Sequence, residues 1–486
     1  MEIVDIFDKR TQNQLYILKE VFMNHGIVNF KQLSTVSSLD PKTITLLWED
    51  ITQYITDDIK LDSKHNYLII RSQIIKDSWI YQLCSKLLLR KKVNLQDFLN
   101  THYISESKIH RKKKQLNHLI SYLQLKIVSK DRHLYLQGKE LQIRMLAQQF
   151  FWSIFRGIEW PFQEIDFKKI DLFLKKTIFL DHKNLIKEIT YMEGAYNFSI
   201  SLIRFNNGGF IKKDELPNYT KKYFSEFSKL EYIRILLRNE FHFTLEEQYY
   251  FLYSLQMNPQ YYLDKTFFSQ TIKALKKNSI DTLYIYNELI KYFNLKEINL
   301  KEFDIAKAVV LAANISATIY HGFYRDISSY LVGEYFEEKS PNLLPNIEKI
   351  VLQLKSDNPD ISFLNETKYL TIKYSEAYAL IKNMFDFEPK IAILVATDTS
   401  IIIEELIVKK LTSIFSTYAN VIFLTTNSKY SGTYDLVIHT AVTINHVTSD
   451  KKLLIADPEL TDKDISEIKE KIDKIVKIKK FSNNSL

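Results

Sequence analysis

The segment SESKIHRKKKQLNHLISYL, residues 105–123, is strongly basic and also regularly apolar. On a helical wheel of about 100° per residue, one face collects the apolar side chains Ile109, Leu116, Leu119, Ile120 and Leu123. The opposite face carries Ser107, Arg111, Lys114 and His118, with Lys108 and Gln115 beside this stripe. The pattern predicts a helix that docks through its leucines and holds cations and hydrogen-bond donors in fixed positions on its outer face.

Such an outer face suits the major groove of duplex DNA, where Arg can bind guanine and Gln can bind adenine through paired hydrogen bonds. Lys112 and Lys113 flank the apolar face, and we expect their stems to cover apolar surface while their ammonium groups reach outward. The simpler alternative is a solvated basic face. The predicted DNA contacts are Ser107, Lys108, Arg111, Lys112, Lys114, Gln115 and His118 of the helix, and Lys130 and Arg132 of the turn that follows it.

The neighbouring segments predict a winged helix-turn-helix unit around this helix. Residues 76–90 and 93–102 have helical patterns, and residues 125–138 read as strand, turn and strand. A similar order precedes them, with three helices over residues 12–56 and a polar turn between extended pieces over residues 60–70. The third helix of that first unit would present Lys42, Leu46, Glu49 and Gln53, with Asp50 nearby. Because carboxylates repel phosphates, we expect this helix to play a supporting role.

The rest of the chain predicts a mainly α, multidomain protein. Residues 141–162 form an aromatic helical stretch that stops at Pro161, and residues 165–385 are almost wholly helical in pattern. The period then changes to alternating apolar strands and helices, which is typical of a small parallel α/β domain. The expected domains are a first winged helix-turn-helix (1–70), a second (71–162), two helical bundles (165–288 and 289–387) and the α/β domain (388–480).

Composition and motifs give little support to an enzyme. The 486 residues carry a formal net charge of +8 and include only nine glycines, and the chain has no GxGxxG, GxxxxGK[ST], HExxH or GxSxG sequence. The single cysteine, Cys84, lies in an apolar run, excludes an intrachain disulfide and fits a cytoplasmic protein. No stretch approaches the ~18 apolar residues of a membrane span. We expect no catalytic residues, no metal and no cofactor.

Three stretches resemble the Mga/AtxA family of virulence transcription regulators from Gram-positive bacteria. They are residues 105–119, residues 134–146 (LYLQGKELQIRML) and residues 150–162 (FFWSIFRGIEWPF), and the domain order behind them also matches. The resemblance implies two winged helix-turn-helix units, two phosphotransferase-regulation bundles and a domain like the EIIB component of the sugar phosphotransferase system. It implies promoter DNA as partner, histidine phosphorylation by a phosphocarrier protein, and a homodimer or higher oligomer.

The sequence also departs from the pattern that the resemblance implies. In the first bundle Gly209 stands where such domains often have a histidine, and only His182 and His242 lie nearby. In the second bundle His321 is the phosphorylation candidate, with a packed helix histidine as the simpler alternative. The loop after the first strand of the EIIB-like domain, residues 396–398, has no cysteine, so a phosphocysteine cannot form there and we expect an interaction domain instead.

Two other functions compete with a DNA-binding regulator. An RNA-binding antiterminator with the same regulatory bundles would need a small β-rich module at the N-terminus, whereas residues 1–60 have helical patterns. A phosphotransferase enzyme or carrier would need the missing loop cysteine. The sequence therefore favours the DNA-binding regulator.

Overall fold

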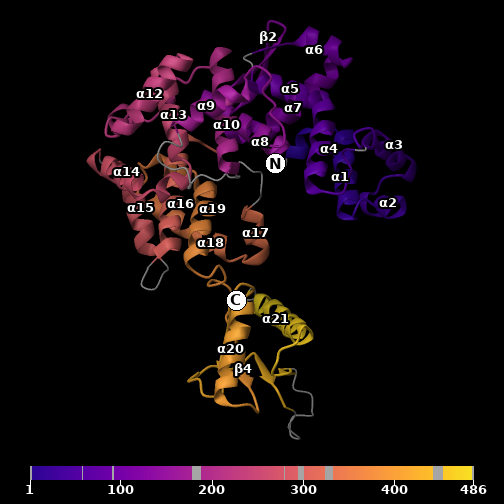
Figure 1. Cartoon of the computed structure of the whole chain (residues 1–486), viewed down its shortest axis with the longest axis vertical. Helices are drawn as coiled ribbons and strands as arrows, with labels where there is room; N and C mark the ends of the chain where they lie inside the picture. Colours follow the sequence, from indigo (N-terminus) through magenta and orange to yellow (C-terminus); the bar gives the residue numbers. More distant parts are fainter. Residues whose placement is uncertain are drawn as a thin grey trace. The chain divides into compact units, whose positions relative to one another are not determined.

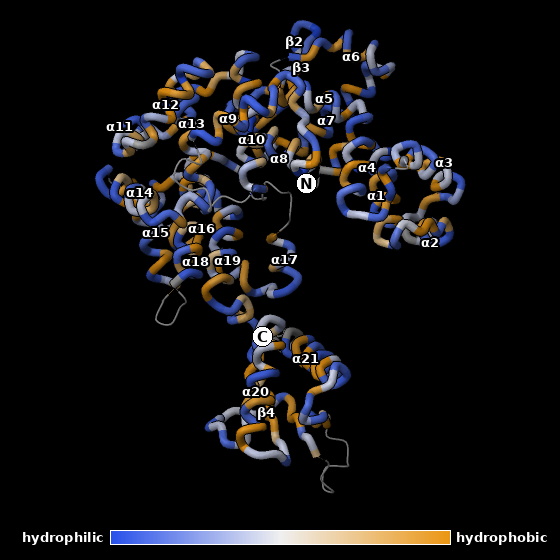
Figure 2. Tube along the Cα trace, in the orientation of Figure 1, coloured by the Kyte–Doolittle hydropathy of each residue, from blue (hydrophilic) through white to orange (hydrophobic). Residues whose placement is uncertain are grey.

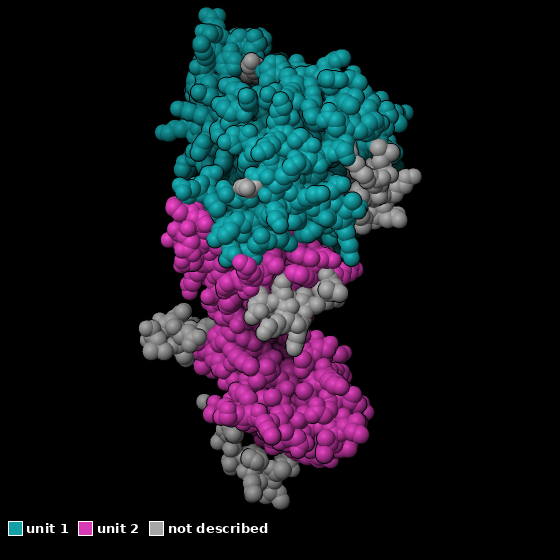
Figure 3. Space-filling model, turned by 90° about the vertical axis from the view of Figure 1, so that its left-hand side faces the viewer, with its two compact units in different colours: residues 1–289, 308–331, 360–370 teal, residues 290–307, 332–359, 371–486 magenta. Residues whose placement is uncertain are grey.

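The computed structural model describes residues 3–56, 58–89, 92–177, 188–278, 280–293, 300–322, 332–441 and 452–483. The chain divides into two compact units, coloured separately in Figure 3. Unit 1 comprises residues 1–289, 308–331 and 360–370, and unit 2 comprises residues 290–307, 332–359 and 371–486. Helices dominate, as the sequence predicted, and a small parallel sheet lies near the C-terminal end of the chain (Figure 1).

The first helical unit consists of α1 (Lys9–Met23), α2 (Phe30–Ser37) and α3 (Pro41–Thr52), preceded by the 3-10 segment η1 (Ile3–Ile6). Asp40 caps α3 by accepting a hydrogen bond from the Thr43 backbone N–H, and Pro41 occupies the first turn. Ile44, Leu47 and Ile51 are buried, so the predicted inner face of α3 is confirmed.

The extended pieces predicted over residues 60–70 are wrong. Helix α4 (Lys64–Asp77) occupies this segment, and Ser63 caps it by accepting from the Asn66 backbone N–H at 3.2 Å. Tyr67, Ile70 and Ile74 recur at helical spacing and are buried. Tertiary packing of this face therefore outweighs the β-propensity of the isoleucines, and the described part of the first unit contains helices but no wing.

The second predicted helix-turn-helix segment, which lies in unit 1, has the expected three helices followed by a two-stranded wing. Its helices are α5 (Trp79–Leu89), α6 (Leu95–His102) and α7 (Glu106–Ile120), and η2 (Ser121–Leu123) extends α7. Strands β2 (Lys126–Lys130) and β3 (His133–Gln137) pair antiparallel as the wing, and the short β1 (Val93–Asn94) pairs with the other edge of β3. Cys84 is buried in α5, as expected.

A long helical region follows the wing. Helix α8 (Glu140–Phe155) is almost entirely buried and ends before Pro161, at Arg156 in the left-handed conformation. The later helices of this region are α9 (Phe167–Thr177), α10 (Glu188–Asn206), α11 (Thr220–Phe224), α12 (Ser228–Phe241), α13 (Leu245–Gln256), α14 (Lys265–Lys277), α15 (Asp281–Tyr292), α16 (Leu300–Ile319), α17 (Val332–Lys339), α18 (Leu343–Asp357) and α19 (Thr367–Ile381), with 3-10 segments η3 (Lys213–Glu215), η4 (Pro259–Leu263) and η5 (Ser362–Asn365).

The C-terminal part of unit 2 is the predicted parallel α/β domain. Its strands β4 (Ile391–Ala396), β5 (Val421–Thr425), β6 (Leu436–His439) and β7 (Leu453–Ile455) form one parallel sheet in the order β5-β4-β6-β7. Helices α20 (Ile401–Phe415) and α21 (Asp462–Asn483) complete its apolar core. Ile402 and Leu406 of α20 remain exposed. Figure 2 shows the chain coloured by hydropathy, with apolar orange stretches along α20.

Candidate nucleic-acid interface

Helix α7 packs against the rest of the second helix-turn-helix segment through its apolar face. Ile109, Leu116 and Ile120 are buried, and Leu123 is buried just after the helix. Ser105 caps the first turn by accepting from the Lys108 backbone N–H at 3.3 Å. The face predicted to dock is therefore the face that docks, and the orientation of α7 about its own axis is fixed by burial.

The opposite face of α7 is open. All six residues predicted for it are exposed: Ser107, Lys108, Arg111, Lys114, Gln115 and His118. The Lys108 ammonium lies 5.4 Å from the centre of the Trp79 ring. Among the described residues, neither Arg111 nor Lys114 forms an ion pair or a hydrogen bond. No described residue therefore neutralises their charges, and both side chains are open to an external anion.

Lys112 behaves differently from the prediction. Its side chain is buried and its Nζ donates to the Phe7 carbonyl oxygen at 3.2 Å. Burial lowers the pKa of Lys112, and the nearby Cys84 and Asp8 only partly oppose this effect. The expectation that this ammonium reaches outward is wrong, because the N-terminal segment around η1 covers it. Lys112 instead ties α7 to residues at the start of the chain.

Two side chains of α7 fix the wing beside it. Asn117 Nδ2 donates to the Ile127 carbonyl oxygen at 3.0 Å, and Asn117 Oδ1 accepts from the Ile127 backbone N–H at 2.6 Å. Lys113 Nζ donates to Ser129 Oγ at 2.8 Å. The asparagine thus bonds strand β2 as a neighbouring strand would. Sequence reasoning missed this role, although an asparagine in mid-helix is a weak helix former and a signal of a specific hydrogen bond.

The tip of the wing places Lys130 and Arg132 in solvent. Lys130 pairs with His133 across the hairpin, so Asp131 and Arg132 form a two-residue loop. Both have positive φ, 51° and 59°, as a type I′ turn requires. A left-handed conformation costs a non-glycine residue about 1–2 kcal/mol. An arginine is therefore kept at this tip at the expense of stability, which is a pattern of functional sites.

The outer face of α3 in the first unit carries carboxylates, as predicted. Glu49 is exposed, whereas Asp50 accepts hydrogen bonds from Arg10 at 2.6 Å and from Gln14 at 3.2 Å. Leu46, on the same face, is 63% exposed. The one cation predicted for this face, Lys42, is also exposed, but it shares the face with Glu49, whereas the predicted outer face of α7 carries no carboxylate.

His321 lies just after α16 and is held by two side chains, those of Glu366 and Gln142. Its Nδ1 is 3.1 Å from Glu366 Oε1, and its backbone exchanges hydrogen bonds with the Gln142 side chain of α8. The next residue, Gly322, has φ +71° and approaches Tyr122 so closely that a Cβ there would lie 2.4 Å from the Tyr122 carbonyl oxygen. Tyr122 belongs to η2, directly after α7. The turn that carries the histidine therefore abuts the segment that ends the predicted recognition helix.

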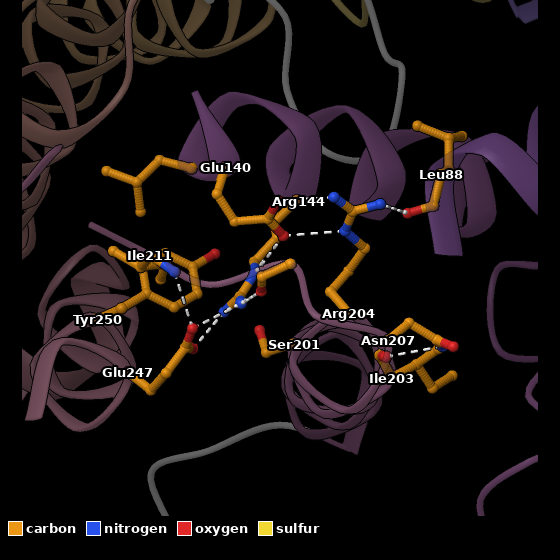
Figure 4. Close-up of polar contacts among 12 residues, drawn as sticks. Leu88, Glu140, Arg144, Ser201, Ile203, Arg204, Asn207, Ile211, Glu247 and Tyr250 are labelled. Carbon is orange, nitrogen blue, oxygen red and sulfur yellow. Dashed lines mark hydrogen bonds and ion pairs between the residues drawn. The ribbon is translucent and has the colours of Figure 1, made fainter. Parts of the chain in front are cut away.

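At Gly209, the position that lacks the expected histidine, a buried ionic network takes up the space. Arg144 of α8 pairs with Glu247 of α13 and with Glu140, and Arg204 of α10 also pairs with Glu140 (Figure 4). A Cβ at position 209 would lie 2.9 Å from Glu140 Oε1 and 3.0 Å from the Arg204 guanidinium. A histidine does not fit here. Of the two nearby histidines, His242 ends α12 in the left-handed conformation, and His182 lies outside the described residues.

The cysteine-free loop after β4 is bonded to a buried carboxylate. Glu404 of α20 accepts hydrogen bonds from the backbone N–H groups of Thr397 and Thr426, at 3.3 and 3.0 Å. Burial opposes ionisation of Glu404, but these hydrogen bonds outweigh it and lower the pKa of the carboxyl. An internal anion thus uses the amides that could otherwise bind an external one.

The described residues contain no group of three or more His, Cys, Asp and Glu side chains placed to hold a metal ion. None of the helices among them is long and apolar enough to cross a bilayer.

A recognition helix on an apolar core with a wing bonded to its side defines the winged helix-turn-helix class of DNA-binding proteins. Residues 65–151 match the family model of the Mga helix-turn-helix domain. This match supports the resemblance to the Mga/AtxA family of regulators, and a helix-turn-helix domain of this kind points to a DNA-binding transcription regulator. No curated protein matches the chain.

Proposed function

We propose that the chain is a transcription regulator that binds promoter DNA through its second winged helix-turn-helix unit. The observation that carries the proposal is the open cationic face of α7, where Arg111 and Lys114 have no partner among the described residues. Arg111, Lys114, Gln115 and His118 are the candidates for base edges, and Lys108, Lys130 and Arg132 for phosphates. Ser107, at the N-terminal end of α7, is a phosphate candidate by position. Lys112 is left out because its ammonium is buried.

Footprinting of the protein on its own chromosome tests the proposal. We expect protection at promoter sequences that is lost in an Arg111→Ala/Lys114→Ala variant. A gel competition between duplex DNA and structured RNA separates the antiterminator alternative. That alternative needs a β-rich N-terminal module, whereas the described residues from 3 to 77 form helices. Preference for RNA over duplex DNA would replace the proposal.

Phosphorylation of His321 is the proposed control. The Glu366 contact at Nδ1 leaves Nε2 as the acceptor for a phosphoryl group from a phosphocarrier protein. The close approach of Gly322 to Tyr122 offers a route by which a new charge would reach the end of α7. Incubation with labelled phosphoenolpyruvate and the general phosphotransfer proteins should label the parent but not His321→Ala, with His242→Ala as the matched control. Label that persists in His321→Ala would refute this acceptor.

Self-association through the EIIB-like α/β domain is the last part of the proposal. The exposed apolar side chains on α20 support it, since Ile402 is 72% and Leu406 is 53% exposed and the two are one turn apart. Sedimentation of an Ile402→Asp/Leu406→Asp variant should show smaller species than the parent. If variant and parent had the same mass at all concentrations, this face of α20 would not be the self-association surface.

A further inference from the structure

A cavity of about 420 Å³ lies within unit 1, between the base of the wing and the turn that carries His321. Its polar lining comes from Gln124, Gln137, Lys139, Gln142, Lys212 and His321. Gln124 precedes β2, Gln137 ends β3, and Lys139 is the residue before α8. The volume falls in the range of about 300–1,000 Å³ that small-molecule sites occupy. It would hold roughly a dozen waters, so a single inorganic ion would leave most of it unfilled.

The close walls of the cavity depend on Gly138. This residue has φ +150°, and a Cβ there would lie 2.2 Å from the Leu125 side chain and 3.1 Å from the Gln124 carbonyl oxygen. Only glycine allows the chain to pass so close to Gln124 and then turn into α8. The result is that Lys139 faces the same space as Lys212 and His321.

The charge of the lining is one-sided. Two lysines and a histidine contribute to it, and none of the described lining residues is acidic. The carboxylates that lie nearby are already engaged. Glu366 contacts His321 Nδ1 and accepts from the Gly322 N–H at 2.6 Å, Glu140 is paired with two arginines, and Glu215 accepts from the Leu141 N–H at 3.1 Å.

We propose that this cavity binds a small phosphate ester. Lys139 and Lys212 would hold the phosphoryl group, because lysine ammonium groups are charged donors suited to phosphate. The side-chain amides of Gln124 and Gln137 can donate to and accept from hydroxyl groups on the remainder of the ligand. The Glu366 contact favours the proton on Nδ1 of His321, which leaves Nε2 as an acceptor for a ligand hydroxyl.

A ligand in this place would join parts of unit 1 that serve different roles. Lys139 connects the wing to α8, Lys212 follows α10, and His321 follows α16. A phosphoryl group held by both lysines would fix the base of the wing to the helical region. The proposal depends neither on DNA binding nor on covalent phosphorylation of His321.

Calorimetry on the full chain tests the site, with glucose 6-phosphate and glycerol 3-phosphate as probes and glucose as the uncharged comparison. We expect saturable binding of at least one ester and none of glucose. Lys139→Gln and Lys212→Gln should each lower the affinity for the ester about tenfold or more, as expected for loss of a charged hydrogen bond. Lys463→Gln, an 86% exposed lysine of unit 2, is the matched control and should bind as the parent does. The proposal would be overturned if neither ester gave saturable heat, or if Lys139→Gln and Lys212→Gln bound the ester as tightly as the parent does.

The phosphoryl group that the two lysines bind could instead be carried by His321 itself after phosphorylation. That alternative rests on the proposed function. The calorimetry therefore uses protein that mass spectrometry shows to carry no phosphoryl group, so that binding identifies a free ester. Should no ester bind, while phosphorylated His321 loses its label faster in Lys139→Gln and Lys212→Gln than in the parent, the cavity receives the modified histidine and the free-ligand proposal is wrong. These measurements contain no DNA, so their failure leaves the DNA-binding proposal standing.

Discussion

Asn117 and Ile127 exchange two hydrogen bonds, from side-chain amide to backbone, and this pair holds the wing against the predicted recognition helix. This polar contact adds to the apolar one between α7 and β2, because Asn117 lies beside the docked face while Ile127 is buried. The relative position of helix and wing is therefore set by one polar side chain as well as by burial.

The first prediction concerns this pair. Asn117→Ala leaves the Ile127 N–H and carbonyl without their side-chain partner, which should cost about 1–3 kcal/mol. We expect the unit to remain folded and DNA affinity to fall severalfold, because the wing loses its position. Asn100→Ala, an exposed asparagine of α6, is the control and should leave affinity unchanged. A gel-shift titration measures both, and parental affinity in Asn117→Ala would show that the wing does not contribute.

The second prediction separates function from stability at the wing tip. Arg132→Gly relieves a left-handed arginine and should raise the free energy of unfolding by about 1 kcal/mol. DNA affinity should fall at the same time, since a cation is lost. Opposite signs in the two measurements are the signature of a residue kept for binding. A stabilised variant with unchanged affinity would remove Arg132 from the interface.

The third prediction addresses the missing histidine. Gly209→His should destabilise unit 1 by about 1–3 kcal/mol, the usual cost of overpacking, because the Glu140 and Arg204 side chains already fill the space. Gly194→Ala in α10 is the matched control, since a Cβ there meets nothing within 4 Å and alanine favours a helix. The four tryptophans, Trp48, Trp79, Trp152 and Trp160, all lie in unit 1, so their fluorescence in urea reports its unfolding. A histidine variant as stable as the parent would contradict the packing described.

The fourth prediction is a pH dependence. Burial opposes ionisation of Glu140, but hydrogen bonds and charges from Arg204 and Arg144 outweigh it and lower the pKa of this carboxyl below its ordinary value of 4.5. The stability that Glu140 contributes is therefore complete above pH 4.5 and is lost as the pH falls through the lowered pKa. Glu140→Gln should be clearly less stable than the parent at pH 7, and this difference should shrink at pH 3.

The control for that experiment is Glu231→Gln, which removes an exposed carboxylate in the same unit. Exposed ion pairs contribute about 0–1 kcal/mol, so its difference from the parent should be small at every pH. A Glu140→Gln difference that stays constant from pH 7 to pH 3 would mean that the network is not ionic.

The sequence predicts the parts of this fold in which periodicity and burial agree. The docked and open faces of α7 follow from helical spacing alone, and the strands of the α/β domain follow from short apolar runs such as residues 391–396. For residues 60–70 the prediction is wrong. Their isoleucines favour a strand by propensity, but Ser63 caps a helix there and Ile70 packs into the core. Local propensity is weak compared with tertiary burial at such a segment.

The polar contacts of the site could not be predicted for a different reason. Lys112 meets the Phe7 carbonyl and Gln142 meets the backbone of His321, so the partners are far apart in sequence. A helical wheel shows the direction of a side chain but not what another segment brings to it. The cavity beside Lys139 likewise exists only because three distant turns converge.

The most direct test of the central claim is the salt dependence of binding to a promoter duplex, measured for the parent and for Arg111→Ala/Lys114→Ala. If a dimer neutralises about eight phosphates, log affinity should fall against log salt with a slope near −7. We expect the double variant to bind at least tenfold more weakly with an unchanged unfolding transition, whereas Lys463→Ala/Lys474→Ala, which removes the same charge from exposed positions in unit 2, should bind as the parent does. Equal affinity of parent and Arg111→Ala/Lys114→Ala at every salt concentration would contradict the assignment of α7 to DNA.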